Sequence, residues 1–396
     1  MRGERILVVG LGPAGLAFLL EVTEKQPDIA RRILAIEKGP DLRDRLAQKR
    51  QTVDRGELTR GFGGAGLFSD GKFCLSLKVG GRLDQVLGEG ERVRLERRVD
   101  HMFESFDGNS HVAYPHASPP IASELHQEGF LWTPYPVRHY GTDQLVNLNH
   151  RLFKELQARG IQFSFSTELL DLDKAPYGWC AKIRSRRGPR EEHFDNVILA
   201  VGKRGARWLH GVGHGIGLRF EAQPVRFGVR VEAPRPGVAK LLELGLDPKV
   251  FLRSGLLKTK LHCFCDGGEL LALDYDGIRV LGGHSLEGLK TSWTNFGVLT
   301  DVFPEDGQGT ATAALELLRP FIERYPGKAV AEPLARFLER ATSPRDLRHG
   351  TLEVNGAVRA GLRPLLGEEV YARLRAFVER LLVVTGDRWL ARAVVY

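Results

Sequence analysis

The chain has 396 residues and a formal net charge of +8, and 42% of its residues are hydrophobic. This length allows two interleaved domains with a substantial core. The four cysteines are too few and too irregularly spaced for a disulfide framework, which favours a reducing compartment. The sequence shows no secretory leader and nothing near the roughly 18 consecutive apolar residues of a membrane helix, so we expect a soluble, cytoplasmic protein without a membrane partner.

The positive charge is spread along the chain and does not form blocks. Basic clusters at residues 94–98 and 184–187 alternate with acids or fall at expected hairpin turns. This pattern is typical of a solvated surface. We therefore expect a small-molecule substrate and no nucleic-acid partner, and the sequence indicates no oligomeric state.

The first expected element is a buried strand that runs directly into a glycine-rich turn. Residues 6–9 are apolar without a polar break, as in a parallel strand covered on both faces. Three glycines then follow the G-x-G-x-x-G spacing of dinucleotide-binding turns, with a helix expected over 16–23. We expect cofactor contacts from this turn, which consists of Gly10, Gly12, Pro13, Ala14 and Gly15.

A second strand over residues 32–37 ends in an acid, as this motif requires. Glu37 is placed to accept hydrogen bonds from both hydroxyls of an adenosine ribose, and Lys38 follows it. The carboxylate argues against a cofactor with a 2′-phosphate. The order of strand, glycines, helix, strand and acid predicts a bound dinucleotide.

Residues 61–72 form a second glycine-rich segment, with five glycines among residues 61–71. Such a run forms neither a stable helix nor a central strand, so we expect a loop with exposed backbone. The loop contains aromatic and aliphatic residues and so differs from a flexible linker. We expect cofactor contacts from Gly63, Gly64, Ala65, Gly66, Ser69 and Lys72.

The middle of the chain predicts another crossover. Leucines at helical spacing indicate a helix over 145–158, followed by a strand over 161–168. Strands near 179–185 and over 196–201, with a turn at 188–189, are typical of the antiparallel flap and last parallel strand of such a domain. We therefore expect Glu168 and Leu169 near the adenine, and Ala200 and Gly202 near the pyrophosphate.

The remainder indicates a second, mainly antiparallel α+β domain. Short strands are expected over 225–233, 260–265, 269–274 and 278–283, separated by Gly and Asp turns. A polar and aromatic group that includes His284, Thr291, Trp293 and Asn295 suggests a loop, either on the substrate side or on an ordinary surface. The predicted fold class is α/β, with a Rossmann-like nucleotide domain joined to this second domain.

Several segments, in this order, resemble one family. They are the run Gly-Gly-Ala-Gly-Leu-Phe-Ser-Asp-Gly-Lys at 63–72, Tyr-Pro-Val-Arg-His-Tyr-Gly-Thr-Asp at 135–143, and the segments 197–203, 227–232 and 263–268. The chain, over roughly residues 5 to 300, is similar to a poorly characterised FAD-dependent dehydrogenase family, NAD(FAD)-utilising dehydrogenase-like flavoproteins with a glutathione-reductase-type FAD domain. The resemblance implies FAD as cofactor and a flavin redox reaction.

The expected catalytic residues are Lys72, Tyr135, Arg138 and His139. Lys72 would place its charge near the flavin ring that becomes anionic on reduction. Arg138 would bind a carboxylate or phosphate, and His139 or Tyr135 would exchange a proton. The alternative is a helix-entry segment in which Arg138 pairs with a nearby acid. His262, Cys263 and Cys265 resemble metal ligands, but a fourth ligand is lacking. We therefore expect a buried apolar cysteine pair on one face of a strand and no metal.

The C-terminus departs from the family pattern. Gly386 and Asp387 imitate its last motif, but they follow an expected helix and no glycine-rich helix start comes after them. We expect an FAD-binding domain at 1–78 and 136–205, with an excursion at 79–135 that belongs to a substrate domain at 206–345. A helical segment at 346–396 would return incompletely to the FAD domain.

The expected activity is an FAD-dependent oxidoreductase that transfers a hydride between the flavin and an organic substrate, with NADH or NADPH as a candidate reductant. A flavin-dependent monooxygenase and a dinucleotide-binding protein with an RNA-contacting basic surface are the alternatives.

Overall fold

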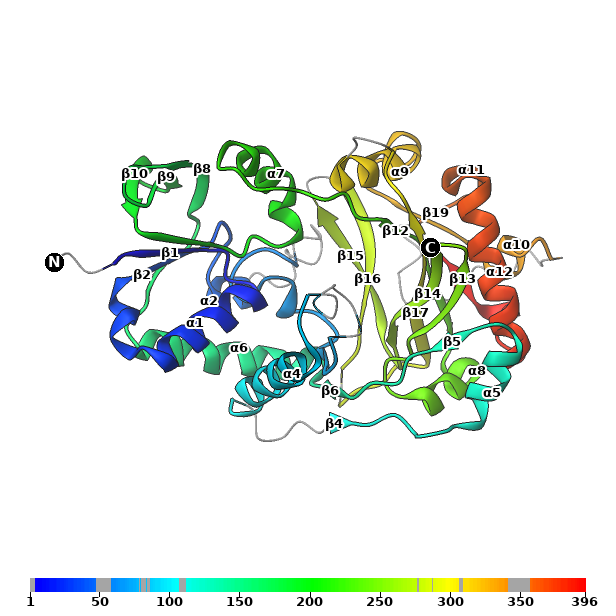
Figure 1. Ribbon diagram of the computed structural model, residues 1–396. Helices are drawn as coiled ribbons and strands as arrows, with labels where there is room; N and C mark the ends of the chain where they lie inside the picture. The colour runs from blue at the N-terminus through cyan, green and yellow to red at the C-terminus, as the bar shows by residue number, and fades with distance from the viewer. Residues whose placement is uncertain are drawn as a thin grey trace. The chain divides into compact units, whose positions relative to one another are not determined.

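A computed structural model of the chain describes residues 4–47, 58–77, 79, 83, 86–106, 112–275, 278–286, 288–305, 309–340 and 357–396 (Figure 1). The chain divides into two compact units that each contain several segments. Unit 1 comprises Met1–Ser69, Arg98–Gly108 and Gln144–Glu221, and unit 2 comprises Asp70–Arg97, Asn109–Asp143 and Ala222–Tyr396.

These borders differ from the expected ones. The chain leaves unit 1 after Ser69, where residue 78 was expected. It returns for Arg98–Gly108, within the expected excursion, and then from Gln144, where residue 136 was expected. The whole segment 357–396 belongs to unit 2, where the sequence suggested an incomplete return to the other domain. Residues 341–356, which belong to the last two expected segments, lie outside the described residues.

Unit 1 contains a parallel sheet with the strand order β11-β1-β2-β7. The strands are β1 (Ile6–Val9), β2 (Ile33–Ile36), β7 (Gln162–Ser164) and β11 (Asn196–Leu199). Helices α1 (Pro13–Lys25) and α6 (Gly141–Ala158) lie below this sheet in Figure 1. All four side chains of β1 are buried, because helices cover one face and a second sheet covers the other.

That second sheet is antiparallel and consists of β8 (Glu168–Lys174), β9 (Trp179–Ser185) and β10 (Gly188–Phe194). Its inward side chains, including Leu172 and Ile183, pack with Leu7 and Val9 of β1 in one hydrophobic cluster. The remaining elements of unit 1 are η1 (Pro27–Arg32), α2 (Leu42–Ala47), η2 (Gly64–Gly66), η4 (Lys203–Gly205), α7 (Ala206–Gly215) and the end of α4 (Glu89–Glu104).

Unit 2 is built on a large sheet with the order β19-β18-β20-β12-β17-β14-β13-β5. Its pairs are antiparallel except for β18 and β19. The strands are β5 (Leu131–Trp132), β12 (Val225–Pro234), β13 (Val250–Ser254), β14 (Leu257–Cys265), β17 (Trp293–Val302), β18 (Ala329–Pro333), β19 (Ala357–Arg359) and β20 (Val394–Val395).

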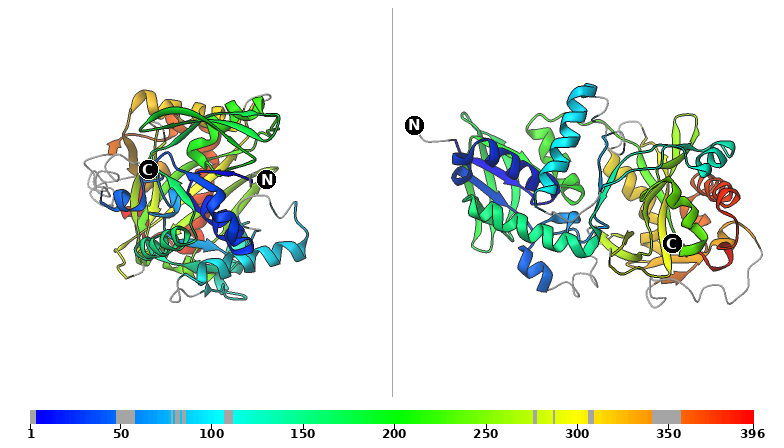
Figure 2. Two further views of the ribbon diagram at one scale, coloured as in Figure 1. Left: turned by 90° about the vertical axis from the view of Figure 1, so that its left-hand side faces the viewer. Right: turned by 90° about the horizontal axis from the view of Figure 1, so that it is seen from below.

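A long helix and a β-hairpin cover opposite faces of this sheet (Figures 1 and 2). Helix α12 (Glu368–Thr385) buries Leu374, Phe377 and Leu381 in the main hydrophobic core of unit 2. The hairpin of β15 (Glu269–Tyr275) and β16 (Ile278–His284) lies on the other face. A small sheet of β3 (Lys72–Cys74), β6 (Val137–His139) and β4 (Val112–Ala113) completes the β structure of the described residues.

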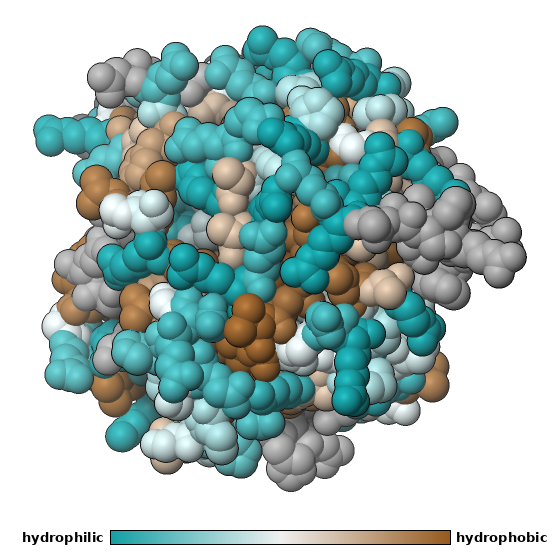
Figure 3. Space-filling view, turned by 90° about the vertical axis from the view of Figure 1, so that its right-hand side faces the viewer, coloured by the Kyte–Doolittle hydropathy of each residue, from teal (hydrophilic) through white to brown (hydrophobic). Residues whose placement is uncertain are grey.

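The helical elements that remain in unit 2 are short apart from one. They are α5 (Pro120–Gln127), α8 (Arg235–Val238), η5 (Ala239–Leu244), α9 (Thr310–Arg324), α10 (Leu334–Phe337), α11 (Arg363–Leu366) and η6 (Leu390–Arg392). The side of unit 2 that carries α11 and α12 is mostly hydrophilic, with small and separate apolar areas (Figure 3).

The predicted fold class is confirmed: unit 1 contains a parallel Rossmann-like sheet, and unit 2 is mainly antiparallel. The prediction of a loop around Trp293 is wrong. Residues from Trp293 onward form β17 in the middle of the large sheet, where Thr294 and Asn295 are fully buried. The chain also returns through β20, which pairs with β12 and β18. Within the described residues, no helix is both long and apolar enough to cross a membrane.

Candidate functional site

The turn between β1 and α1 contains three glycines, of which two are required by close contacts with neighbouring backbone and one is not. Gly10 has φ +97°, and a Cβ atom on it would lie 2.4 Å from the Ala200 carbonyl oxygen. A Cβ on Gly15 would lie 2.1 Å from the Gly10 carbonyl oxygen. The protein's own packing therefore requires glycine at these two positions, because the turn touches the end of β11 and the helix touches the turn.

Gly12 is different, because its backbone suits any residue and its surroundings are open. It has φ −79° and ψ −175°. Among the described residues, an added Cβ would come within 4 Å only of the Gly64 Cα, at 3.9 Å. No side chain caps α1 there, and the first-turn residues Pro13 and Ala14 follow. The turn thus leaves room for another group beside the positive end of a helix.

Glu37 joins the parts of this site through its carboxylate. Its Oε2 accepts a hydrogen bond from the Leu11 N–H at 3.0 Å. Its Oε1 accepts from Gly39 N–H at 2.8 Å and from Gly61 N–H at 3.2 Å. The sequence predicted that ribose hydroxyls donate to Glu37. In this structure, backbone amides of the turn and of the glycine-rich loop donate hydrogen bonds to its carboxylate. An ionised carboxylate has about four lone-pair sites, so about one remains for a further donor.

The glycine-rich loop lies against the turn and is held by a buried arginine. The Gly63 N–H donates to the Leu11 carbonyl at 2.8 Å. The Arg45 guanidinium, from α2, donates to the carbonyl groups of Leu58, Phe62 and Gly64, and its side chain is only 1% exposed. Burial lowers the pKa of Arg45 to about 10. Sequence reasoning missed Arg45, because nothing near it in the chain distinguishes it from a surface arginine.

The other predicted cofactor contacts are placed as follows. Lys38 Nζ and a Glu168 carboxylate oxygen are 2.6 Å apart, and Arg184 also pairs with Glu168. Leu169 is a core residue, so its side chain contacts apolar neighbours. The Ala200 N–H donates to the Val9 carbonyl, Ser69 Oγ donates to the Gly66 carbonyl, and Gly202 has φ +61° with open space where a Cβ would lie.

Unit 2 contains a buried ionic cluster around Asp70 and Lys72. Lys72 Nζ lies 2.6 Å from Asp70 Oδ2, and the two side chains are 9% and 5% exposed. Lys72 also donates to the Phe264 carbonyl, and Ser285 Oγ donates to Asp70 Oδ1. His139 Nε2 is 2.9 Å from the Asp70 carbonyl oxygen. The antiparallel pairing of Lys72 with His139 in β3 and β6 brings these side chains to one place.

Opposing influences set the charges of this cluster. Burial acts to raise the pKa of Asp70, but the Lys72 ammonium outweighs it and holds that pKa well below its usual range. Burial acts to lower the pKa of Lys72, and the Asp70 carboxylate reverses this. The pair is therefore fully ionised inside unit 2.

A second group surrounds Asp247. The Tyr135 hydroxyl donates to Asp247 Oδ2 at 2.7 Å, and the Phe264 N–H donates to Oδ1 at 3.1 Å. Burial, followed by the charge of Asp247, raises the pKa of Tyr135, so this tyrosine is a fixed donor. Phe264 connects the two groups, since its carbonyl accepts from Lys72.

Of the four predicted catalytic residues, the structure therefore brings Lys72 and His139 to Asp70 and places Tyr135 on Asp247. Arg138 lies in the middle of β6, where it pairs with Phe73 and Val112 and is 3% exposed. Helix α6 begins at Gly141, and the Thr142 N–H donates to the Ser285 carbonyl. Asp247 was missed because it is 112 residues from Tyr135.

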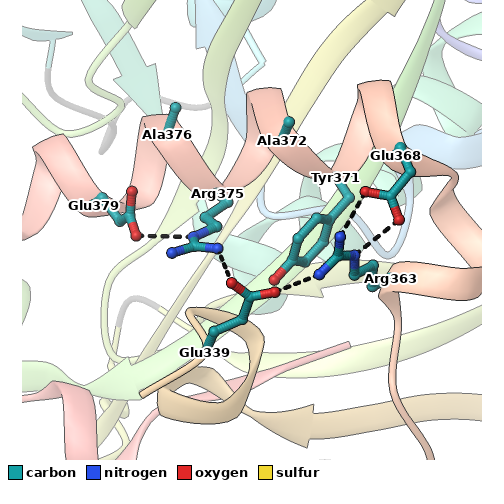
Figure 4. A pocket seen from close by; sticks show the side chains of 8 residues that line it. All are labelled: Glu339, Arg363, Glu368, Tyr371, Ala372, Arg375, Ala376 and Glu379. Atoms are coloured by element: carbon teal, nitrogen blue, oxygen red, sulfur yellow. Dashed lines mark hydrogen bonds and ion pairs between the residues drawn. The ribbon is translucent and has the colours of Figure 1, made fainter.

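A shallow hollow on unit 2 also contains many charges (Figure 4). Arg363 pairs with Glu339 and Glu368, and Arg375 pairs with Glu339 and Glu379. The charged groups drawn in Figure 4, two arginines and three glutamates, are thus all paired with one another, which does not favour a ligand there. Within the described part of the chain, no group of three or more His, Cys, Asp or Glu side chains is arranged to bind a metal.

No protein-family model and no curated protein matches this chain. Similar solved structures include aklavinone-11 hydroxylase in a ternary complex with FAD and aklavinone, at 15% identity and TM-score 0.34, covering 80% of this chain and 50% of that one.

Glycine oxidase from Geobacillus kaustophilus is similar at 14% identity and TM-score 0.35, covering 98% of this chain and 95% of that one. The p-nitrophenol 4-monooxygenase PnpA from Pseudomonas putida DLL-E4 is similar at 12% identity and TM-score 0.36, covering 96% and 80%. TM-scores below 0.5 assign neither an activity nor a ligand to this chain.

Proposed function

We propose that the protein is an FAD-dependent oxidoreductase that transfers a hydride between the flavin and a small organic substrate. The observation that carries this proposal is the open space at Gly12, where the protein's own packing does not require a glycine. A pyrophosphate is the group for which backbone approach at this position is needed.

The donors and acceptors of unit 1 fit the adenosine diphosphate part of FAD. The Ala14 and Gly15 amides open α1, where no side chain caps the helix, and would donate to the pyrophosphate. Glu37 would accept from a ribose hydroxyl through its remaining lone pair. A 2′-phosphate beside this carboxylate would be repelled, which favours FAD over a phosphorylated dinucleotide.

The glycine-rich loop would supply further contacts from Gly63 to Gly66. Arg45 supports this loop through its carbonyl groups. The Gly63, Gly64 and Gly66 amides already donate to backbone carbonyl groups, so these glycines would serve close approach of the cofactor. The roles of Lys38, Ser69, Glu168, Ala200 and Gly202 stay predictions of the same site. When bound, FAD supplies hydride and electron transfer that amino-acid side chains lack.

Within unit 2, the proposed substrate-handling residues differ in what they can do. His139 Nε2 faces a carbonyl oxygen, which only accepts, so Nε2 carries the proton and Nδ1 is the nitrogen able to take one. Tyr135 is a donor fixed on Asp247 and holds its proton. We assign proton acceptance to His139 and orientation of Asp247 to Tyr135, and the substrate anion to Arg138.

The visible absorption spectrum of the purified full-length protein tests this function. We expect flavin bands, release of FAD on denaturation, and bleaching on anaerobic addition of NADH or NADPH. A protein that holds no flavin after incubation with FAD and shows no binding in a fluorescence titration would contradict the proposal. Bound FAD that neither pyridine nucleotide reduces would restrict the proposal to substrate as the reductant.

A further inference from the structure

Two cysteines on β14 lie unusually close together for their spacing in a strand. The Sγ atoms of Cys263 and Cys265 are 3.6 Å apart. Residues two apart in a regular strand are separated by about 6.6 Å along the chain, so their side chains do not normally touch. The pairing of β14 with β17 is irregular between His262 and Cys265, and Cys263 has φ +49°. This bulge turns the two sulfur atoms toward each other.

A left-handed backbone at a residue other than glycine is unfavourable, and it persists only where the surrounding structure imposes it. Here the surrounding contacts are specific. The Phe264 N–H donates to Asp247 and its carbonyl accepts from Lys72, so the peptide groups between the cysteines are fixed on both sides. The close sulfur pair is therefore built into the fold of unit 2.

Positive charge lies directly beside one of the two sulfur atoms. Arg230 Nη2 is 3.3 Å from Cys265 Sγ and 3.1 Å from the Cys263 carbonyl oxygen. Asn295 Oδ1 accepts from Arg230 Nε at 2.8 Å and so holds the guanidinium in place. The hairpin covers this contact, since a Cβ on Gly283 would lie 1.9 Å from Arg230 Nη2.

The charges around the pair favour one thiolate. The hydrogen bond from the Cys265 thiol lowers the pKa of Cys263, and the charges of Arg230 and Lys72 lower it further. Burial and the charge of Asp70 act to raise this pKa, but they are outweighed. The pKa of Cys265 is raised by its hydrogen bond to Cys263 and by burial. Asp247 accepts a hydrogen bond from the Phe264 N–H, and its charge acts to raise the pKa of Lys72. His262 precedes the pair on β14. These influences make Cys263 the thiol of the pair that loses its proton more easily.

The two cysteines differ in their exposure to solvent. Cys263 is half-buried, whereas Cys265 is fully buried. A reactive thiolate that can be reached from solvent, with a buried thiol in contact behind it, is the arrangement needed for attack followed by resolution.

We propose that Cys263 and Cys265 form a thiol–disulfide exchange site that takes small organic disulfides. The Cys263 thiolate attacks one sulfur of a disulfide RS–SR, which forms a Cys263–S–SR bond and releases RS⁻. Cys265 then loses its proton and attacks Cys263 Sγ, which forms the Cys263–Cys265 disulfide and releases the second RS⁻. The protein dithiol is oxidised, RS–SR is reduced to two thiols, and the sulfur atoms close from 3.6 Å to about 2.05 Å.

The exchange is tested on full-length protein with Cys74→Ser and Cys180→Ser, which leaves only the pair. After incubation with glutathione disulfide, intact mass should show the loss of two hydrogen atoms and no retained glutathione. The added Cys265→Ser substitution should trap one glutathione on Cys263. The added Cys263→Ser substitution should leave Cys265 unmodified. An unchanged pair, a stable adduct with both cysteines present, or an adduct on Cys265 would overturn the proposal.

The pH dependence of alkylation provides a second readout. The rate of reaction of the pair with iodoacetamide should have its midpoint at least one pH unit below the value of about 8.5 of a free thiol. Arg230→Met should move this midpoint upward, and circular dichroism checks that the variant is folded. A midpoint at or above that of a free thiol in the unsubstituted pair would overturn the proposal. These measurements need no flavin, so their outcome is independent of the proposed FAD activity.

Discussion

At the scale of single residues, the three glycines of the first turn show that one motif contains two kinds of constraint. Gly10 and Gly15 are required by contacts inside unit 1, because an added Cβ would meet carbonyl oxygens at 2.4 and 2.1 Å. Gly12 has no such contact within the described residues. A sequence pattern cannot separate packing from ligand approach, but the structure does.

This difference gives a prediction for Gly12→Ala. Because its φ of −79° is an ordinary value, the variant should fold with a thermal midpoint close to that of the unsubstituted protein. The new methyl group would occupy the space for the pyrophosphate, so FAD affinity should fall at least tenfold, or about 1.4 kcal/mol. Flavin titration and thermal unfolding measure the two effects.

Gly15→Ala is the matched control for this variant. Its methyl group would collide with the Gly10 carbonyl, so the control should lose stability even without FAD. Equal thermal losses in both variants, or normal flavin binding by Gly12→Ala, would contradict the assignment.

The Asp70–Lys72 pair leads to a second prediction. Lys72→Met would leave a buried carboxylate without its ammonium partner, a change that costs about 3–5 kcal/mol in comparable pairs. The double variant Lys72→Met/Asp70→Asn removes both charges and should recover a large part of this loss. Urea unfolding of the four proteins of the cycle gives the coupling free energy. Strictly additive losses would show that the two side chains do not stabilise each other.

The neutrality of this pair also changes what is expected of Lys72 toward a flavin. A lone ammonium would favour the anionic reduced ring, but Asp70 lies 2.6 Å from Lys72 Nζ and offsets most of its field. The shift in reduction potential on substitution of Lys72 should therefore be smaller than that of an isolated lysine.

At the scale of elements, α2 supports the glycine-rich loop through Arg45. The Arg45 guanidinium donates hydrogen bonds to carbonyl oxygens of Leu58, Phe62 and Gly64. Its central carbon, Cζ, lies 5.0 Å from the centroid of the Phe68 ring. The loop is therefore held by a side chain from outside it as well as by its own backbone hydrogen bonds.

We predict that Arg45→Met releases the loop while leaving the parallel sheet intact. The variant would leave several buried carbonyl groups without a donor, at about 1–3 kcal/mol for each group that water does not reach. FAD affinity should fall, and limited proteolysis near residues 58–66 should become faster. Arg43, an exposed arginine of the same helix, provides the control through Arg43→Met. Equal proteolysis of both variants would contradict the role of Arg45.

The sequence could predict those elements whose structure is determined by residues close together in the chain. The strand over 6–9, the glycine turn and the acid at Glu37 each follow from a short run of residues, and the structure places them as β1, the turn and the end of β2. In contrast, β17 contains Thr294, Asn295 and Gly297, which look like loop residues. They lie in a central strand because Arg230 and β14 provide buried polar partners, a fact that no local window contains.

The candidate site shows the same division. Its glycines were found by spacing, whereas Arg45 and Asp247 owe their roles to partners distant in the chain. The contact between Cys263 and Cys265 depends on one bulge in β14, and a two-residue spacing alone predicts no such contact.

At the scale of the whole molecule, the ionised carboxylates of unit 2 predict a stability that depends on acid. Burial would raise the pKa of Asp247, but the ammonium groups of Lys72 and Lys249 lower it to about 2, below the usual value of about 3.9. The unfolded chain then binds the proton first as the pH falls. The contribution is complete above about pH 4 and is lost toward pH 2, at about 2 kcal/mol for Asp247, and Asp70 acts in the same direction.

Tryptophan fluorescence can follow this loss in unit 2. Trp389 is buried in the core of that unit, whereas Trp179 and Trp208 belong to unit 1. In a Trp179→Phe/Trp208→Phe background, urea unfolding should show the free energy of unfolding of unit 2 falling between pH 4 and pH 2. Asp247→Asn should be less stable at pH 7 and should reduce that slope, because an amide does not titrate. If both proteins lost stability equally over this range, the acid sensitivity would come from other groups, and the buried charges around Phe264 would not control it.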